Sequence, residues 1–194
     1  MSLWGNSDAD ESKPKNLTTA EKKEVYATAS GWVREAGSAL SGNSNTSADP
    51  EVLVAISALS TNLGAADVTE VEWITTAADK SAGFTLSIRV RYNEAVAVTG
   101  NPTLAVTNGN QGSGSGRGPH TLSYVSGTGT NELVFSLTIA AANAATNEDD
   151  VLVIGAQNIA LAGGTLKDKG TSTNSAVAIS AAQGTECGSI TVVA

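Results

Sequence analysis

The chain has 194 residues, a formal net charge of −8 and an aromatic content of only 4%. The negative charge disfavours binding to nucleic acid or to an anionic membrane surface, because both are negatively charged themselves. Because aromatic residues are few, aliphatic residues must fill the core. The 20 glycines favour short strands joined by many turns.

The first segment, residues 1–16, is polar and charged except for Leu3 and Trp4. Such a segment cannot bury itself. A tryptophan near a chain end is suited to anchoring in its own domain, in a sister subunit or in a partner. The alternative is a packed or frayed terminus without a binding role. We expect Leu3 and Trp4 to contact a partner.

The rest of the chain before residue 76 carries weaker signals. Thr18-Thr19-Ala20-Glu21 fits a helix capping box and predicts a short helix over residues 19–27, although the end of that range suits a strand equally well. Trp32 belongs either to a small core or to an interface, and we take it as a third candidate for partner contact. Residues 51–56 form a short apolar run typical of a strand. We expect residues 1–75 to form a small, partly extended anchoring segment.

The remainder, residues 76–194, has the pattern of an antiparallel β-sandwich. Residues 84–92 alternate between apolar and polar side chains, which indicates a half-buried strand, and Asn93-Glu94 interrupts this run. Turns then recur about every ten residues, which is the rhythm of a sandwich of about seven to nine strands. The side chains that we expect to face inward are Phe84, Leu86, Ile88, Val90, Leu133, Phe135 and Leu137.

Three stretches of this second part carry recognisable motifs. Residues 93–104 read Asn-Glu-x-Val-x-Val-x-Gly-x-Pro-x-Leu after a strand, residues 124–135 contain a Gly-Thr-Gly turn, and residues 163–170 end the pattern. Together they resemble the bacterial Ig-like repeats of large surface and adhesin proteins. The resemblance covers residues 80–180 and implies an Ig-like antiparallel β-sandwich. It indicates fold more than function, because such modules serve as spacers, stalks and recognition heads.

The first part resembles a different group of proteins. Residues 2–6, Gly31-Trp32-Val33 and residues 51–55 are similar to the start of virion structural proteins of marine contractile-tailed phages, especially cyanophages. An anchoring segment that carries an Ig-like domain is a familiar arrangement among phage decoration proteins. The resemblance implies a location in the virion, assembly in the host cytoplasm, many copies or a homo-oligomer, and major capsid or neck proteins as partners. The chain departs from repeat arrays in having one Ig-like unit, so we expect no long stalk.

Catalytic and metal-binding motifs are scarce. His120 is the only histidine, so neither an ordinary zinc site nor an ordinary Ser-His-Asp triad can be assembled. Residues 112–118 are rich in glycine but precede strand residues rather than a helix, which favours a hairpin loop over a phosphate loop. Residues 147–150 are acidic but lack the spacing of a helix-loop-helix calcium site, and we interpret them as a solvated turn. Calcium held by Asp149, Asp150 and Asp168 is the alternative.

The leading hypothesis is a non-enzymatic virion structural protein that decorates the capsid or neck, attaches through its N-terminal part and projects an Ig-like domain. The alternative is a host-recognition or carbohydrate-binding module of a tail fibre or adhesin, which would bind a host surface glycan through an exposed aromatic cluster. A glycan hydrolase would need two carboxylates across a cleft. We predict no catalytic residue, no cofactor, no metal, and no binding to nucleic acid or membrane.

Overall fold

The computed structural model describes residues 13–14, 16–109, 118–141, 143 and 145–194. Leu3, Trp4 and residues 112–117 of the glycine-rich stretch lie outside the described residues. The described chain is mainly β, with 46% strand and 11% helix, as the sequence predicts. None of its helices is long and apolar enough to cross a membrane.

The first elements form a small antiparallel layer, the N-terminal part, which comprises the described residues among 13–63. Its strands follow one another as neighbours, β1 beside β2 and β2 beside β3. The capping box at Thr18 is confirmed, but the helix is shorter than predicted because residues 25–28 join the sheet instead. The elements are α2 (Thr19–Lys23), β1 (Val25–Thr28), β2 (Gly31–Arg34), the 3-10 helix η1 (Ala39–Ser41), β3 (Glu51–Ala55) and α3 (Leu59–Asn62).

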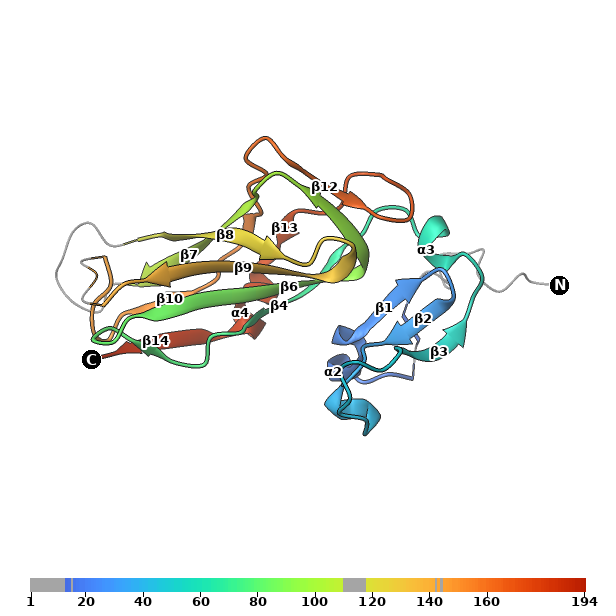
Figure 1. Ribbon diagram of the computed structural model, residues 1–194, viewed down its shortest axis with the longest axis horizontal. Coiled ribbons are helices and arrows are strands. Elements are labelled where there is room, and N and C mark those ends of the chain that lie inside the picture. Colours follow the sequence, from blue (N-terminus) through green and yellow to red (C-terminus); the bar gives the residue numbers. More distant parts are fainter. Residues whose placement is uncertain (1–12, 15, 110–117, 142, 144) are drawn as a thin grey trace.

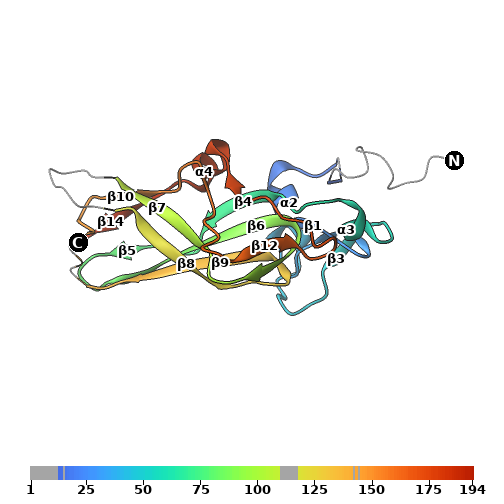
Figure 2. The same cartoon turned by 90° about the horizontal axis from the view of Figure 1, so that it is seen from above.

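The remaining described residues, 64–194, form the main body, at the other end of an elongated molecule (Figures 1 and 2). Its described residues form more strands than the sequence predicts. Three of these strands, β5, β11 and β13, are only two residues long, which is too short to give an alternating pattern in the sequence. The elements are β4 (Val68–Trp73), β5 (Ala78–Asp79), β6 (Phe84–Thr99), β7 (Thr103–Gly109), β8 (His120–Ser126), β9 (Thr130–Ile139), β10 (Val151–Val153), β11 (Gln157–Asn158), β12 (Thr165–Asp168), β13 (Ala178–Ile179), α4 (Ala181–Cys187) and β14 (Ser189–Val193).

Strand β6, with 16 residues, is the centre of the sheet. It pairs antiparallel with β9, β4 and β12, and in parallel with β1 of the N-terminal part. The sequence suggested a break at Asn93-Glu94, but β6 continues through these two residues. Instead the register with β9 shifts between Arg91 and Val96, which marks a bulge or irregularity. On the other edge of β6 the partner changes from β4, opposite Ile88–Tyr92, to β12, opposite Val96–Thr99.

The described strands form one mixed twelve-stranded sheet and a small two-stranded one. Because β4 pairs with β6, residues 68–73 are part of the same sheet as the main body, while the boundary between residues 75 and 76 stays a prediction. Along the main path the order of the large sheet is β3-β2-β1-β6-β9-β8-β7-β10-β14-β5, with β4 and β12 paired beside β6.

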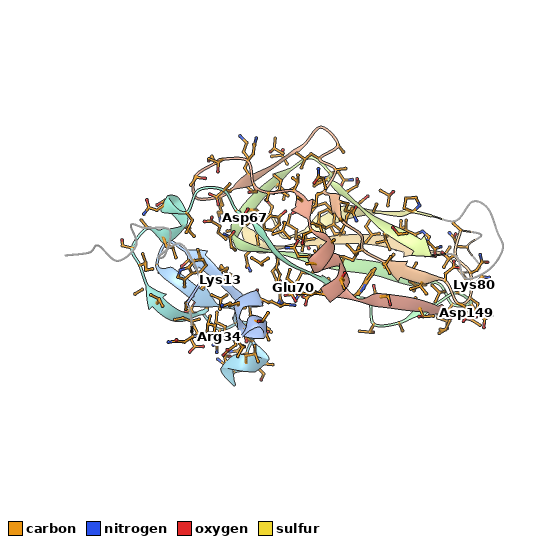
Figure 3. The ribbon with its side chains drawn as sticks, turned by 180° about the vertical axis from the view of Figure 1, so that it is seen from behind. Lys13, Arg34, Asp67, Glu70, Lys80 and Asp149 are labelled. Atoms are coloured by element: carbon orange, nitrogen blue, oxygen red, sulfur yellow. The ribbon has the colours of Figure 1, made fainter. Side chains whose placement is uncertain are left out.

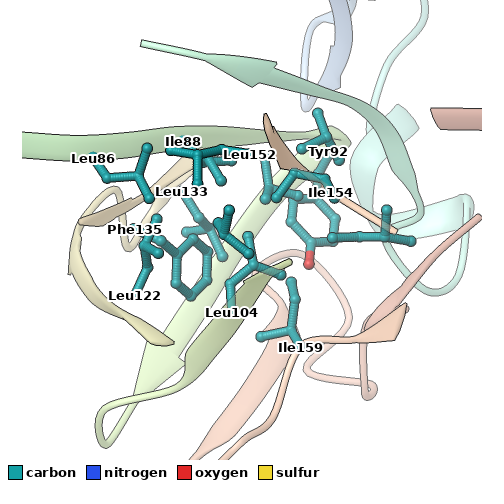
Figure 4. Close-up of a cluster of buried hydrophobic side chains, with 14 of the residues drawn as sticks. Leu86, Ile88, Tyr92, Leu104, Leu122, Leu133, Phe135, Leu152, Ile154 and Ile159 are labelled. Atoms are coloured by element: carbon teal, nitrogen blue, oxygen red, sulfur yellow. The ribbon is translucent and has the colours of Figure 1, made fainter. Parts of the chain in front are cut away.

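Two separate hydrophobic clusters support this sheet. The larger one fills the main body with aliphatic side chains around Phe135 and Tyr92 (Figure 4). Five of the seven side chains predicted to face inward are 0% exposed. The other two, Phe84 and Leu137, are partly buried and pack against the cluster. The smaller cluster lies in the N-terminal part and consists of Val25, Ala27, Trp32 and Leu59.

A core substitution tests this arrangement. Leu86 is completely buried, so Leu86→Ala should leave a cavity and lower the free energy of unfolding by roughly 2–5 kcal/mol. Val125 is 61% exposed, and Val125→Ala should change it by no more than about 0.5 kcal/mol. Urea denaturation followed by circular dichroism measures both. Equal effects for the two variants would place Leu86 outside the core.

Candidate functional site

Of the three residues predicted to contact a partner, Trp32 is the one that lies among the described residues. Trp32 lies in β2 with 2% of its surface exposed, packed in the small N-terminal cluster. Its ring therefore belongs to the core of the N-terminal part, which is one of the two alternatives given for Trp32, and its contact with a partner stays a prediction. Leu3 and Trp4 lie outside the described residues, so their contact role stays a prediction.

The most concentrated polar site is a group of charges around Arg91, here called the Arg91 cluster. It consists of Arg89, Arg91 and four glutamates, Glu35, Glu70, Glu72 and Glu132. The Arg91 guanidinium lies 2.9 Å from Glu132, 3.2 Å from both Glu35 and Glu70, and 3.4 Å from Glu72. Only 9% of the Arg91 side chain is exposed, so the guanidinium itself is largely shielded from water.

Strand register explains how acids far apart in the sequence meet at Arg91. Arg91 stands opposite Glu70 of β4 on one side and opposite Glu132 of β9 on the other. Glu35 follows β2 and comes from the N-terminal part. The side-chain amide of Asn131, in β9 of the main body, donates a hydrogen bond to Glu35 at 3.1 Å. The cluster therefore bridges the two parts of the molecule, and Glu70 marks the junction in Figure 3.

Lysines of the N-terminal part extend the cluster. Lys23 lies 3.1 Å from Glu70 and 3.3 Å from Glu186 of α4. Burial lowers the pKa of Lys13 to about 8, although Glu35 and Glu70 act in the opposite direction. The two parts are thus joined by charges as well as by the single β1–β6 bridge between Ala27 and Glu94.

The pKa values of the cluster reflect its burial. Burial raises the pKa of Glu35 to about 7; Arg91 opposes this shift and Glu132 adds to it. Burial by itself lowers the pKa of Arg91, but the carboxylates of Glu35, Glu72, Glu132 and Glu70 outweigh it, so the guanidinium stays charged. The cluster therefore holds one carboxyl group that titrates near neutral pH.

A pocket of about 450 Å³ opens beside the cluster, between the two parts of the molecule. Its lining includes Tyr26, Glu35, Arg91 and Glu132. A hydrolase would need two carboxylates free to act on a substrate. Here Glu132 is held by both arginines, and Glu35 by Arg91 and Asn131. The arrangement holds the two structural parts together.

The lone histidine has a structural environment. His120 begins β8 and is 7% exposed, and its Nε2 lies 3.1 Å from the Thr146 hydroxyl. Burial lowers the pKa of His120, although nearby Asp150 opposes the shift. Thr146 and Asp150 are both 0% exposed, so this group of side chains is buried among the described residues. The ring is therefore part of the buried interior at the start of β8.

The acids considered as an alternative calcium site do not converge. Asp150 is buried and accepts a hydrogen bond from the Asn147 N–H at 2.8 Å, while Asp149 is exposed. Asp168 lies on β12, at the opposite end of the main body from these two residues (Figure 1). The three aspartates therefore cannot share one ion.

Comparisons of the chain with protein-family models, with curated proteins and with solved structures find no match. The geometry of the Arg91 cluster and the sequence resemblances are thus the basis for any functional interpretation. The sequence did not reveal the cluster, since its four glutamates lie between positions 35 and 132 without a common motif.

Removal of the central charge tests the cluster. Arg91→Gln should lower the free energy of unfolding by roughly 3–5 kcal/mol, because it leaves buried carboxylates without a partner. Arg89 lies in the same strand and contacts two of the same glutamates, but its side chain is 31% exposed. Arg89→Gln should therefore cost no more than about 1 kcal/mol. Urea denaturation measures the free energy of unfolding of both variants. A smaller decrease for Arg91→Gln than for Arg89→Gln would contradict the central role of Arg91 in the cluster.

The raised pKa of Glu35 makes a pH prediction. The folded state binds the proton more tightly than the unfolded state, whose carboxyl titrates near 4.5. Its contribution to stability is thus present in full below pH 4.5 and is lost as the pH rises through about 7. Thermal unfolding across this range should show a shallower decline for Glu35→Gln than for the wild type. Identical slopes would show that Glu35 titrates normally.

Proposed function

We propose that this chain is a non-enzymatic structural protein of a phage virion that decorates the capsid or neck. In this proposal the N-terminal part attaches to other virion proteins, and the main body, an Ig-like β-sandwich, projects from the particle. The sequence resemblances described above motivate the proposal. One structural observation supports it most directly, which is the free edge of β3.

Strand β3 ends the strand order at the N-terminal side, so it pairs with β2 on one edge while its other edge has no strand neighbour among the described residues. Val52 of this strand is 53% exposed, and Leu40 in the preceding 3-10 helix is 45% exposed. An exposed strand edge with apolar side chains is a template for pairing with a strand of another protein. We assign this edge as the attachment surface for a neighbouring virion protein.

The arrangement of the two parts fits attachment at one end. The N-terminal part and the C-terminus lie at opposite ends of the long axis (Figures 1 and 2). The Arg91 cluster fixes the angle between the parts, because its carboxylates come from both. A protein attached through β3 would therefore hold its main body away from the particle surface, and repeated copies would add their weak contacts through avidity.

The pairing pattern of the main body supports the Ig-like proposal. Strands β6, β9, β8, β7, β10 and β14 pair antiparallel in this order, and their inward side chains share one core. The stretches that resemble Ig-like repeats provide β6, the β8–β9 hairpin and β12. Their pairing within one sheet supports the proposal that these stretches belong to one unit.

The glycan-binding alternative would be recognised by an exposed aromatic cluster on the main body. Tyr92 and Phe135 are at most 1% exposed, and Phe84 and Tyr124 pack against the core. Tyr124 makes an edge contact with Phe135, with ring centroids 6.1 Å apart. These four rings are committed to folding, so the structure favours attachment over sugar recognition.

A co-sedimentation assay tests the proposal with phage particles that lack this protein. Val52→Lys should reduce binding by about tenfold or more, since it places a charge at the centre of the proposed contact. Val125→Lys is the matched control, because Val125 is an exposed strand valine in the main body. It should bind like the wild type. Trp4→Ala should also weaken binding if the first segment takes part in attachment.

Three results would count against the proposal. If the wild-type protein does not sediment with the particles, the virion role is wrong. If Val125→Lys fails while Val52→Lys binds normally, attachment occurs through the main body. If both variants bind normally, the free edge of β3 is not the attachment surface.

A further inference from the structure

The two parts of the molecule have separate hydrophobic cores. Among the described residues, the small cluster around Trp32 and the large cluster around Phe135 have no side chain in common. Burial of apolar surface therefore stabilises each part by itself. The contacts described above that join the parts are polar. They are the ion pairs of Arg91 and Lys23 and the backbone bridge from β1 to Glu94 of β6.

The covalent connection between the parts contains a position suited to a hinge. Gly64 has a φ of +95°, and a Cβ added to it would meet no atom within 4 Å. Its carbonyl accepts a hydrogen bond from the Thr171 hydroxyl at 2.9 Å, and Ala66, two residues later, is completely buried. The chain is therefore fixed to the main body from the Gly64 carbonyl onward. Rotation about the N–Cα bond of Gly64 would move the N-terminal part as one unit and leave this carbonyl in place.

Glu35 is an acid of the N-terminal part that crosses the junction. Its carboxylate lies 3.2 Å from the Arg91 guanidinium, and its side chain is 17% exposed. Burial raises the pKa of Glu35 to about 7, although Arg91 acts in the opposite direction. The charged and titratable groups that face Glu35 come from both parts of the molecule: Arg91 of β6, Glu132 of β9, Glu24 before β1, Tyr26 of β1, and Lys13.

Glu94 is the residue of β6 with which β1 pairs, so it lies at the backbone link between the parts. Glu94 and Asp168 of β12 are each 1% exposed. Their carboxyl groups are hydrogen-bonded to each other, which requires one of them to hold a proton. Burial raises the pKa of Glu94 to about 8, and Asp168 and Asp67 add to this shift. The side-chain link and the backbone link of the junction thus each involve an acid that prefers its protonated form.

Ionisation of these two acids disfavours the closed junction. If the parts separated, water would reach both carboxyl groups, which would then titrate near their ordinary value of 4.5. The closed form binds the protons more tightly, so its advantage is present in full below pH 4.5. That advantage is lost as the pH rises through about 7 for Glu35 and about 8 for Glu94. Within its window, each group lowers the ratio of closed to open molecules by up to about tenfold per pH unit.

We propose that the junction between the N-terminal part and the main body is a pH-sensitive joint, which is closed while Glu35 and Glu94 hold their protons and opens about Gly64 when both ionise. Each part keeps its own hydrophobic cluster in the open form, so opening is a movement of two folded parts. The movement would widen the pocket of about 450 Å³ between the parts and uncover β6 where β1 now pairs with it.

Energy transfer between two dyes measures this opening in the full chain. One dye is attached at Asn45→Cys in the N-terminal part and the other at Val125→Cys in the main body, with Cys187→Ser to remove the native thiol. Transfer should change as the pH rises from about 5 to about 9, while the circular dichroism of the strands is retained. The pair Asn101→Cys and Val125→Cys lies within the main body and should give constant transfer.

Glutamine variants identify the acids that control the joint. At about pH 8, Glu35→Gln should raise the ratio of closed to open molecules by roughly tenfold or more, because the neutral amide cannot ionise. Glu35→Gln combined with Glu94→Gln should keep the junction closed over the whole pH range. Glu148→Gln makes the same charge change at an exposed acid of the main body and should open like the wild type.

Several results would overturn the joint. Constant transfer in the wild type would show that the parts do not separate, and opening on acidification would show that ion pairs alone hold them. Loss of the strand signal together with the transfer change would mean that the molecule unfolds as one unit. Equal pH dependence in Glu35→Gln and Glu148→Gln would place the controlling group elsewhere, and this comparison decides the matter if the double variant does not fold. None of these results depends on whether the protein belongs to a virion.

Discussion

Strand β6 must satisfy the hydrogen-bonding groups on both of its edges along 16 residues, and this requirement determines where most other segments lie. One edge is covered by β9 over most of its length. The other is covered in turn by β4 and then by β12, while β1 reaches the strand at Glu94. Because the last of these partners comes from the N-terminal part, the same strand that organises the main core also carries the junction between the two parts.

Charge reinforces this junction in a way that apolar packing would not. A buried ion pair gains little net stability compared with well-packed hydrophobic residues, but each charge is costly in any arrangement that leaves it unpaired. Arg91 is satisfied only when β4, β9 and the residue after β2 all hold their present positions. The cluster thus acts mainly on the relative orientation of the two parts, while the two hydrophobic clusters stabilise each part separately.

The sequence was informative where a local pattern determines the structure. Alternation predicted the inward side chains of β6 and β9, and the capping box at Thr18 predicted the start of α2. It was misleading at Asn93-Glu94, where polar residues looked like a break but lie inside a continuous strand. It also could not show that Trp32 is covered by Leu59, or that Arg91 meets glutamates from three elements. These contacts depend on which strands become neighbours, and that information is not local.

Arg91 and Glu94 show two treatments of buried charge within one strand. Arg91 is neutralised inside the chain by four carboxylates, so the protein needs nothing from solvent to hold that position. Glu94 has Asp168 as its neighbour, and among the described residues no lysine or arginine forms an ion pair with either acid; burial and the Asp168 side chain raise the pKa of Glu94 to about 8. Both arrangements respond to pH, because the pKa of Glu35 in the first is raised to about 7 and the pKa of Glu94 in the second is raised to about 8. Because both side chains belong to β6, the protonation state of Glu94 and the ion pairs of Arg91 act on the same junction between the two parts.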